Sequence, residues 1–150
     1  LHTYLFTHQD GHTPGVEIEG ITTAVTTDLA KLVDAYHLAT GAPKDWLTSY
    51  LGNLISREEL FFLEDNGAIV GGCEVRKSET NKQVADVGMV VNPEFRKMGK
   101  GTLLLTYAAN QASLAGRQAI CSCEAGNIGS RKAIERTGFT TRHSLYRISF

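Results

Sequence analysis

The feature that most constrains this chain is the segment from Met89 to Thr102, in which an apolar strand leads through a short loop into a helix that starts with two glycines. Glycines allow the backbone to approach a ligand closely and to expose consecutive N–H groups. The first turn of a helix adds unpaired N–H donors and a partial positive charge. Arg96, Lys97 and Lys100 add full positive charges. We therefore expect a cradle for a pyrophosphate at this helix start.

The spacing of the glycines excludes the two commonest phosphate-binding loops. A P-loop requires Gly-x4-Gly-Lys-Ser/Thr, whereas the chain reads Gly99-Lys100-Gly101-Thr102. A dinucleotide-binding loop requires Gly-x-Gly-x-x-Gly, and the third glycine is replaced by Leu104. The observed order is instead Arg-x-x-Gly-x-Gly, preceded by Val-Val-x-Pro.

Hydrophobic periodicity over the whole chain predicts a mixed α/β (α+β) sheet with helices on both faces. The strands come first as an antiparallel meander, with a tight turn at Asn66-Gly67, and later alternate with helices in a βαβ pattern. The predicted strands are Tyr4–Phe6, Ile18–Val25, Leu60–Leu63, Ala68–Val75, Val84–Val91, Gln118–Glu124 and one or two within Phe139–Phe150. The predicted helices begin at Asp28, Pro43, Gly99 and Ile128 and end near Gly41, Leu54, Ala115 and Thr137.

Composition and length indicate one soluble domain. The chain has 150 residues, of which 42% are hydrophobic, enough to bury a core. No apolar run approaches the ~18 residues of a membrane span, and the three cysteines are too few for a disulfide scaffold. We therefore expect a cytoplasmic protein with free thiols and no membrane partner. Residues 1–16 are interpreted as an N-terminal arm or the remnant of a preceding segment, and residues 17–150 as the domain.

The formal net charge of −1 conceals two halves of opposite sign. Residues 1–75 carry three basic and eleven acidic side chains, and residues 76–150 carry twelve basic and five acidic ones. The chain could thus offer one region to a cation and another to an anion. The alternative, that the two halves simply neutralise each other across a solvated surface, stays open.

Two stretches together resemble the GNAT superfamily of N-acetyltransferases. The first is the Val-Val-x-Pro and Arg-x-x-Gly-x-Gly order around Arg96. The second runs from Asn127 to Phe139, an Asn-led helix that closes in Gly-Phe. The resemblance covers about residues 59–142. The motif sequence, with Ser130 three residues after Asn127, most resembles that of the branch that acetylates the N-termini of ribosomal proteins.

The resemblance implies a splayed sheet that admits acetyl-CoA as co-substrate. The pantetheine arm would lie between the strand before the cradle and the strand after the cradle's helix. A bulge near Val90 would aim one N–H at the thioester oxygen. The residues that the resemblance implies for acetyl-CoA binding are Met89, Val90, Val91, Arg96, Lys97, Met98, Gly99, Lys100, Gly101, Thr102, Asn127 and Ser130.

The implied reaction is direct attack of an amine on the acetyl group, and such an amine has to lose a proton. Glu74 and Asp86 on adjacent predicted strands are candidate bases, with Glu124 as a third. Which face they occupy stays open, because a one-residue shift in register exchanges the faces. The family's usual tyrosine, seven residues after the helix Asn, is replaced by Ile134, so Ser130 is the candidate group for assisting the sulfur.

Other side chains are given structural interpretations. Cys121 and Cys123 are expected to be small buried thiols, and the N-terminal histidines a solvated arm, so no metal site is predicted. Trp46 and Tyr50 are expected to pack in the core, with a border of the acceptor groove as the alternative. No interleaving of basic and aromatic residues indicates nucleic acid.

The expected partner is a small-molecule or peptide amine, and a homodimer through the closing strands is left open. Two alternatives to the enzyme remain. One is a non-catalytic CoA-binding module or half of a tandem protein. The other is a protein-interaction domain.

Overall fold

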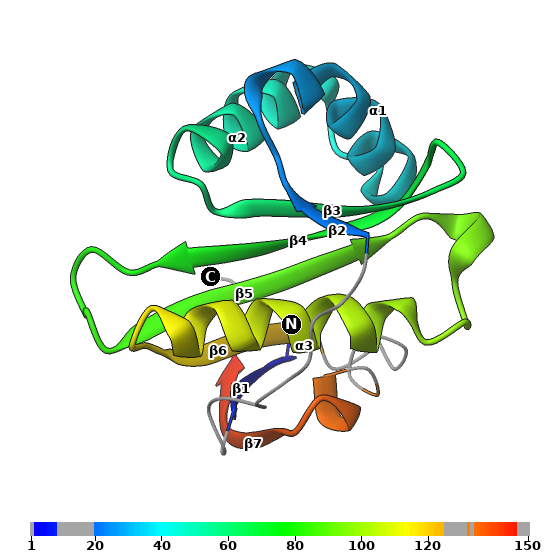
Figure 1. Cartoon of the computed structure of the whole chain (residues 1–150). Coiled ribbons are helices and arrows are strands. Elements are labelled where there is room, and N and C mark those ends of the chain that lie inside the picture. Colours follow the sequence, from blue (N-terminus) through cyan, green and yellow to red (C-terminus); the bar gives the residue numbers. More distant parts are fainter. Residues whose placement is uncertain (1, 9–19, 125–131, 133, 147–150) are drawn as a thin grey trace, which may run out of the picture.

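The structure, a computed structural model, describes residues 2–8, 20–124, 132 and 134–146. Within these ranges, seven strands form one sheet in the order β2-β3-β4-β5-β6-β1-β7 (Figure 1). The strands are β1 (His2–His8), β2 (Ile21–Thr23), β3 (Leu60–Asp65), β4 (Ala68–Lys77), β5 (Val84–Val91), β6 (Gln118–Glu124) and β7 (Phe139–Tyr146). The helices are α1 (Leu29–Thr40), α2 (Lys44–Ser56) and α3 (Lys100–Leu114), with short 3₁₀ turns η1 (Thr26–Asp28) and η2 (Pro93–Phe95). No helix in the described ranges is long and apolar enough to cross a membrane.

The sheet is mixed, as predicted. Strands β2 to β5 form an antiparallel meander, and β5 pairs in parallel with β6 after the crossover through α3. β1 then lies between β6 and β7 and is antiparallel to both. Residues 2–8 of the N-terminal segment predicted as an arm or remnant therefore form a strand of the sheet, at the place of the predicted strand Tyr4–Phe6.

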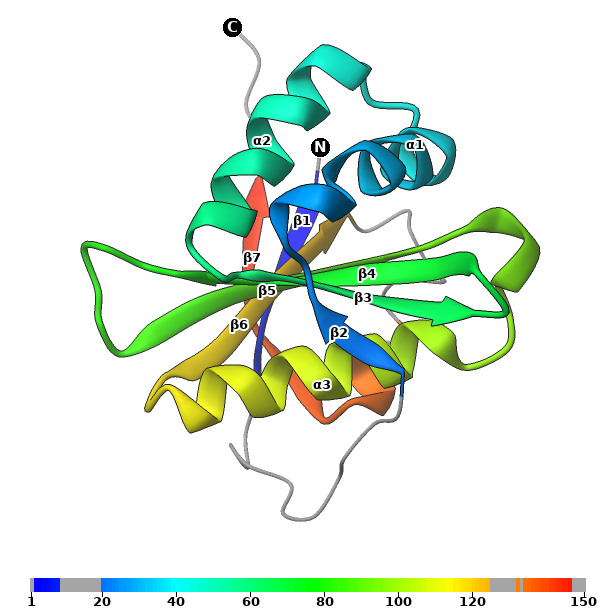
Figure 2. The same cartoon turned by 45° about the horizontal axis from the view of Figure 1, so that its top comes forward.

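The two halves of the sheet separate at β5 and β6. These strands pair over only three positions, from Val84 with Gln118 to Asp86 with Ile120. Beyond that point β5 continues to Val91 along β4, while β6 continues along β1. Figure 2 shows β6, β1 and β7 crossing at a steep angle to β3, β4 and β5. The sheet is splayed here, in agreement with the sequence-based expectation.

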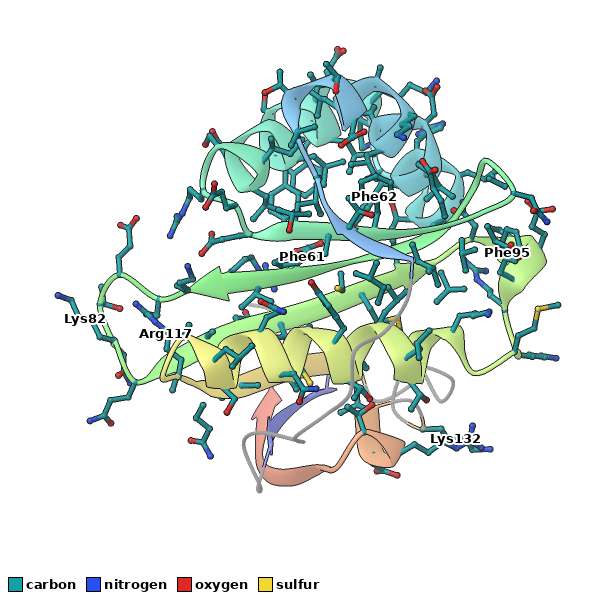
Figure 3. All side chains as sticks on the ribbon, viewed as in Figure 1. Phe61, Phe62, Lys82, Phe95, Arg117 and Lys132 are labelled. Carbon is teal, nitrogen blue, oxygen red and sulfur yellow. The ribbon has the colours of Figure 1, made fainter. Side chains whose placement is uncertain are left out.

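Two cores cover the two faces of the sheet, because successive side chains of a strand point to opposite sides. Phe61 packs with α3 and Phe62 with α1 and α2, although the two residues are neighbours on β3 (Figure 3). Fully buried residues such as Leu104 of α3, and Leu32 and Leu51 of α1 and α2, are the centres of the two cores. The predicted helices on both faces are thus confirmed.

The helix predicted to begin at Asp28 starts one residue later, at Leu29. The carboxylate of Asp28 accepts the N–H of Val25 at 2.8 Å and closes the turn η1 instead of capping α1. Most of the helix predicted from Ile128, with Asn127 and Ser130, lies outside the described residues.

Candidate functional site

The cradle predicted before α3 has free backbone donors. Gly99 adopts a φ of 75° as the residue before the helix, and Lys97 adopts a φ of 65°. No side chain caps the helix start, and its first backbone bond runs from Leu103 to Gly99 at 3.2 Å. The amides of residues 97–102 make no hydrogen bond to any described residue. This row of donors at a helix N-terminus fits a pyrophosphate.

Side chains around the cradle divide into two roles. Lys97 and Lys100 have no ion-pair partner among the described residues, so their charges are available to an anion. Arg96 instead donates from Nε to the Val91 carbonyl at 3.2 Å and from Nη2 to the Ala39 carbonyl at 2.9 Å. The guanidinium therefore ties the loop to α1, a contact that the sequence did not reveal.

The pairing of β5 with β4 determines which backbone groups of β5 face the gap between β5 and β6. Asn92 donates its N–H to the Val70 carbonyl at 2.8 Å, and the carbonyl of Val90 points at Gly71, where any Cβ would collide with it. Backbone groups alternate in direction along an antiparallel strand. The backbone N–H and C=O groups of Val90 therefore point to β4, and those of Met89 and Val91 point to the gap between β5 and β6.

The bulge predicted near Val90 is wrong. The β4–β5 ladder keeps one register from Lys77 with Ala85 to Gly71 with Val91. A register shift occurs instead in the β3–β4 ladder, between Leu63 and Glu64. A regular β5 therefore leaves the amides of Met89 and Val91, rather than that of Val90, as donors at the gap.

Glu74 is the centre of a polar cluster beneath α2. Its side chain is buried, and Oε2 accepts the hydroxyl of Tyr50 at 2.5 Å. Arg76 Nε lies 3.5 Å from the same oxygen, and Arg76 Nη2 lies 3.2 Å from Asp86 Oδ2. The structure thus brings the two candidate bases to one face of the sheet, on either side of a shared guanidinium.

Burial distinguishes the two carboxyl groups. Desolvation raises the pKa of Glu74, against the opposing effects of the Tyr50 hydroxyl and the Arg76 charge. Burial also raises the pKa of Asp86, while Arg76 lowers it, but this side chain is 46% exposed, whereas that of Glu74 is 10% exposed. Glu74, with the more buried carboxyl group, is therefore the stronger candidate for proton exchange.

Two aromatic side chains of α2 extend this cluster to the surface. The rings of Trp46 and Tyr50 stack with centroids 4.8 Å apart and an angle of 12° between their planes. Trp46 is 55% exposed, which corrects the expectation that it packs in the core. Tyr50 therefore links a surface ring to a buried carboxylate, a role that its spacing on the helix did not predict.

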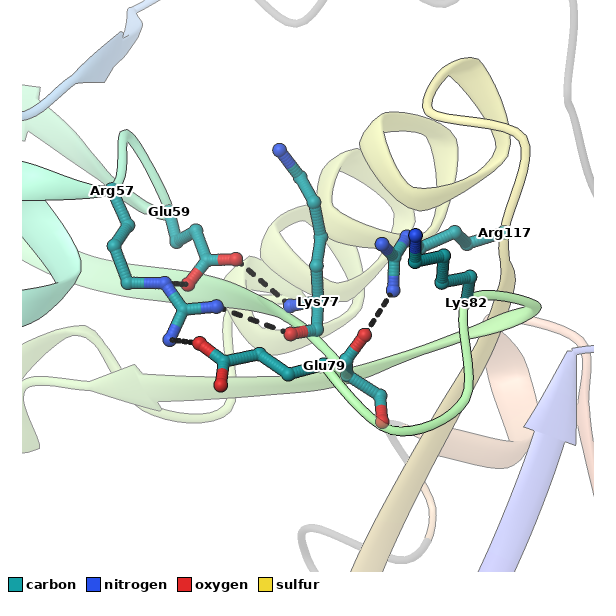
Figure 4. Close-up of a pocket in the computed structure, with 7 residues that line it drawn as sticks. Arg57, Glu59, Lys77, Glu79, Lys82 and Arg117 are labelled. Atoms are coloured by element: carbon teal, nitrogen blue, oxygen red, sulfur yellow. Dashed lines mark hydrogen bonds and ion pairs between the residues drawn. The ribbon is translucent and has the colours of Figure 1, made fainter.

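A hollow of about 490 Å³ lies at the other end of β5, beside the β4–β5 turn (Figure 4). Four cationic side chains line it, but its arginines already bind protein groups. Arg57 pairs with Glu59 at 3.0 Å and Glu79 at 3.4 Å, and Arg117 donates to the carbonyls of Ser78 and Val84 at 2.7 and 3.1 Å. These contacts anchor the hairpin, and we assign the hollow no part in the site.

Several predicted residues are not brought into the site by the described chain. Asn127 and Ser130 lie outside it, as does the side chain of Glu124. Among the described residues no group of three or more His, Cys, Asp or Glu could hold a metal ion. Ile134, which stands where the family's tyrosine was expected, is buried in the core beside α3.

Comparison with known proteins gives one family. Residues 28–139 match the model of the acetyltransferase (GNAT) family. An acetyltransferase from the GNAT family of Colwellia psychrerythraea is 33% identical, with a TM-score of 0.88 over 93% of this chain and 52% of that one. Among curated protein sequences no relative matches.

Two further structures share the fold at lower identity. An acetyltransferase from Novosphingobium aromaticivorans is 19% identical, with a TM-score of 0.78 over 95% of this chain and 61% of that one. The protein yncA from Salmonella typhimurium, solved with its cofactor acetyl-CoA, is 18% identical, with a TM-score of 0.65 over 80% of this chain and 78% of that one. The chain spans only about half to three-fifths of the first two structures.

Proposed function

The chain belongs to the acetyltransferase (GNAT) family, and from this premise we propose that it is an N-acetyltransferase, which moves the acetyl group of acetyl-CoA to a primary amine by direct attack. The proposal depends above all on one observation. The free amides of residues 97–102 lie at the end of β5, where this strand has separated from β6. A diphosphate and a slender arm attached to it would both find donors there.

The residues present fit acetyl-CoA. The cradle amides, with Lys97 and Lys100, would hold the pyrophosphate, and the backbone of Met89 and Val91 would hold the amide groups of the pantetheine arm. When bound, the co-substrate supplies an acetyl thioester, which is activated toward a nucleophile. Asn127 and Ser130 stay candidates for the arm and the sulfur.

The polar cluster around Glu74 would bind the acceptor amine and take up its proton. An alkylamine with a pKa near ~10 is mostly protonated at neutral pH and has to give up a proton before it reacts. Glu74 would take this proton, with Asp86 as the second candidate. Two carboxylates and one guanidinium leave the cluster with a net negative charge, which favours a cationic amine of a small molecule or a peptide.

A second candidate function is a non-catalytic CoA-binding module or one half of a tandem protein. The observation in its favour is length, since the chain covers 52% of the Colwellia psychrerythraea structure. Such a module would bind acetyl-CoA through the same cradle without transferring the acetyl group.

Two measurements on the purified chain test these proposals. Isothermal titration with acetyl-CoA is expected to show saturable heat for both functions, and its absence would contradict both. Release of free thiol from acetyl-CoA across a panel of primary amines and peptides is expected only for the enzyme. Tight binding with no thiol release for any acceptor would favour the module.

A further inference from the structure

Gly88 of β5 lies directly opposite Glu74 in the β4–β5 ladder. Directly opposed residues of an antiparallel pair carry their side chains on the same face, within about 5 Å of each other. Gly88 has no side chain, so no side chain of β5 fills the position beside Glu74. Gly88 is also partly exposed, although it lies in the middle of the sheet.

The space above Gly88 is bounded by the polar cluster. A Cβ built on Gly88 would meet nothing closer than Arg76 Nη2 at 4.0 Å. The guanidinium of Arg76, the group nearest to this space, is paired with Glu74 and Asp86. The next residue along β5, Met89, turns its backbone to the gap between β5 and β6. The space therefore adjoins both the buried carboxylate and the proposed acetyl-CoA site.

Tyr50 fixes the direction of the Glu74 carboxylate. Both contacts of this carboxylate, with the Tyr50 hydroxyl and with Arg76 Nε, involve Oε2. No hydrogen bond joins Oε1 to a described residue, and Oε1 is not one of the buried atoms that lack a partner. The stack on Trp46 holds the Tyr50 ring in turn. One carboxylate oxygen is thus anchored, and the other is available to a ligand.

We propose that the acceptor's primary amino group binds over Gly88, with its nitrogen beside Oε1 of Glu74, while Tyr50 holds Oε2 as a positioning residue. This inference rests on the proposed function and specifies where its acceptor binds. This acceptor site over Gly88, beside Glu74, is called the seat below. It favours a protonated amine, because the carboxylates of Glu74 and Asp86 outnumber the single guanidinium of Arg76. Oε1 then receives the proton, and the neutral nitrogen is left at the edge of the gap.

Four charged or titratable groups face Glu74 from the elements around it. Tyr36 comes from α1 and Tyr50 from α2, Arg76 is on β4, and Asp86 is on β5. Tyr50 and Arg76 favour the ionised carboxylate, and Asp86 disfavours it. Loss of the Tyr50 hydroxyl therefore makes the carboxyl group of Glu74 harder to ionise.

A steric probe at Gly88 tests the seat, since its backbone is not in a glycine-only conformation. Gly88→Ala and Gly88→Val are expected to fold and to bind acetyl-CoA within about 2-fold of the wild type. Their kcat/KM for the best acceptor of the panel should fall by at least ~10-fold, largely through KM, with valine worse than alanine. The matched control is Gly52→Ala in α2, where the nearest atom to the new Cβ is 4.0 Å away and full activity is expected.

Tyr50→Phe tests the positioning role by a pH profile. The acid limb of kcat/KM should move upward by about 1–2 pH units, because a hydrogen bond to a charged carboxylate is lost. Titration of ¹³C-labelled Glu74 by NMR should show the same displacement in the absence of acetyl-CoA. An unchanged limb and an unchanged titration would overturn the role of Tyr50.

The possible outcomes distinguish a failure of the acceptor site over Gly88 from a failure of the proposed function. Gly88→Val with full activity would overturn the seat and leave the acetyltransferase standing. A wild type that binds acetyl-CoA yet releases no thiol with any amine would overturn the enzyme, and the seat with it. A Gly88 variant that loses acetyl-CoA binding as well would place the effect at the gap and contradict an acceptor seat.

Discussion

The hydroxyl of Tyr36 lies over Gly72, so close that a Cβ on this glycine would be 2.7 Å from Tyr36 Oη. Tyr36 belongs to α1 and Gly72 to β4, and the missing side chain lets the helix approach the sheet at this point. The contact lies two residues along β4 from Glu74. The spacing between α1 and the strand that carries the candidate base therefore depends on one glycine.

Gly72→Ala is expected to destabilise the protein by about 1–3 kcal/mol, because the new methyl group overpacks a tight contact. It would lie 3.0 Å from Tyr36 Cε1 and 3.1 Å from the Phe61 carbonyl as well as against the hydroxyl. Urea denaturation measures the change. Gly52→Ala is the control, expected to gain up to about 1 kcal/mol from helix propensity. Equal effects of the two substitutions would contradict the close packing of Tyr36 on Gly72.

Tyr36→Phe is expected to leave the protein as stable as the wild type or to stabilise it by about 1 kcal/mol. Tyr36 is buried, and its hydroxyl has no hydrogen-bond partner among the described residues. An unpaired buried hydroxyl carries a desolvation penalty that phenylalanine does not. Thermal denaturation checks the sign. A clear loss of stability would mean that the hydroxyl has a partner in solution.

Combining the two substitutions tests whether they act at one contact. Tyr36→Phe removes the atom nearest to the new methyl group of Gly72→Ala but leaves the ring carbon. The double variant should therefore recover part of the lost stability, with a favourable coupling energy in a double-mutant cycle. Strict additivity would show that the alanine is accommodated elsewhere.

Much of the fold could be predicted because the sequence patterns that indicate it lie within short continuous segments. The bounds of β5 and β6 match the predicted strands, since each is a short apolar run with a clear end. The start of α3 was visible in its glycines, and its predicted end near Ala115 agrees with the structure, in which Ala115 follows the helix and Gly116 adopts a φ of 73°. The cradle could likewise be found from one continuous stretch of sequence.

The site's side-chain contacts could not be predicted, because they join residues far apart in the chain. Tyr50 meets Glu74 across 24 positions, and Arg96 meets Ala39 across 57. The common face of Glu74 and Asp86 depends on strand register, which a single-residue shift would reverse. The bulge was misplaced for the same reason, since alternation along one strand does not show how its neighbour is aligned.

Glu74→Gln should change the pH dependence of stability. Burial raises the pKa of Glu74 in the folded protein above the 4.5 of an ordinary glutamate. Between these two values the folded state holds a proton that the unfolded state has released, so this group's contribution to stability falls as pH rises through that window. Glutamine does not titrate. The stability of Glu74→Gln relative to the wild type should therefore increase from pH 4 upward and then level off.

Urea denaturation at intervals from pH 4 to pH 8 measures this difference. Each pKa unit of elevation corresponds to about 1.4 kcal/mol between the two ends of the window. Asp86→Asn provides the comparison, with a change of the same sign and smaller size, because burial also raises the pKa of Asp86 but this side chain is half-exposed. A difference between Glu74→Gln and wild type that decreases with pH would show that the carboxylate is stabilised by its surroundings.

The two cationic residues Arg96 and Lys100 are expected to behave differently when each is replaced by alanine. Arg96 holds the carbonyls of Ala39 and Val91, so Arg96→Ala should lower the free energy of unfolding by about 1–3 kcal/mol. Lys100 has no ion-pair partner among the described residues and starts α3, so Lys100→Ala should leave stability within about 0.5 kcal/mol. Its effect should appear in acetyl-CoA binding instead, as a weaker affinity whose dependence on salt is reduced. Calorimetric titration at two ionic strengths, beside urea denaturation, distinguishes the two residues. Arg96→Ala with unchanged stability would contradict its role as a tie between the cradle and α1.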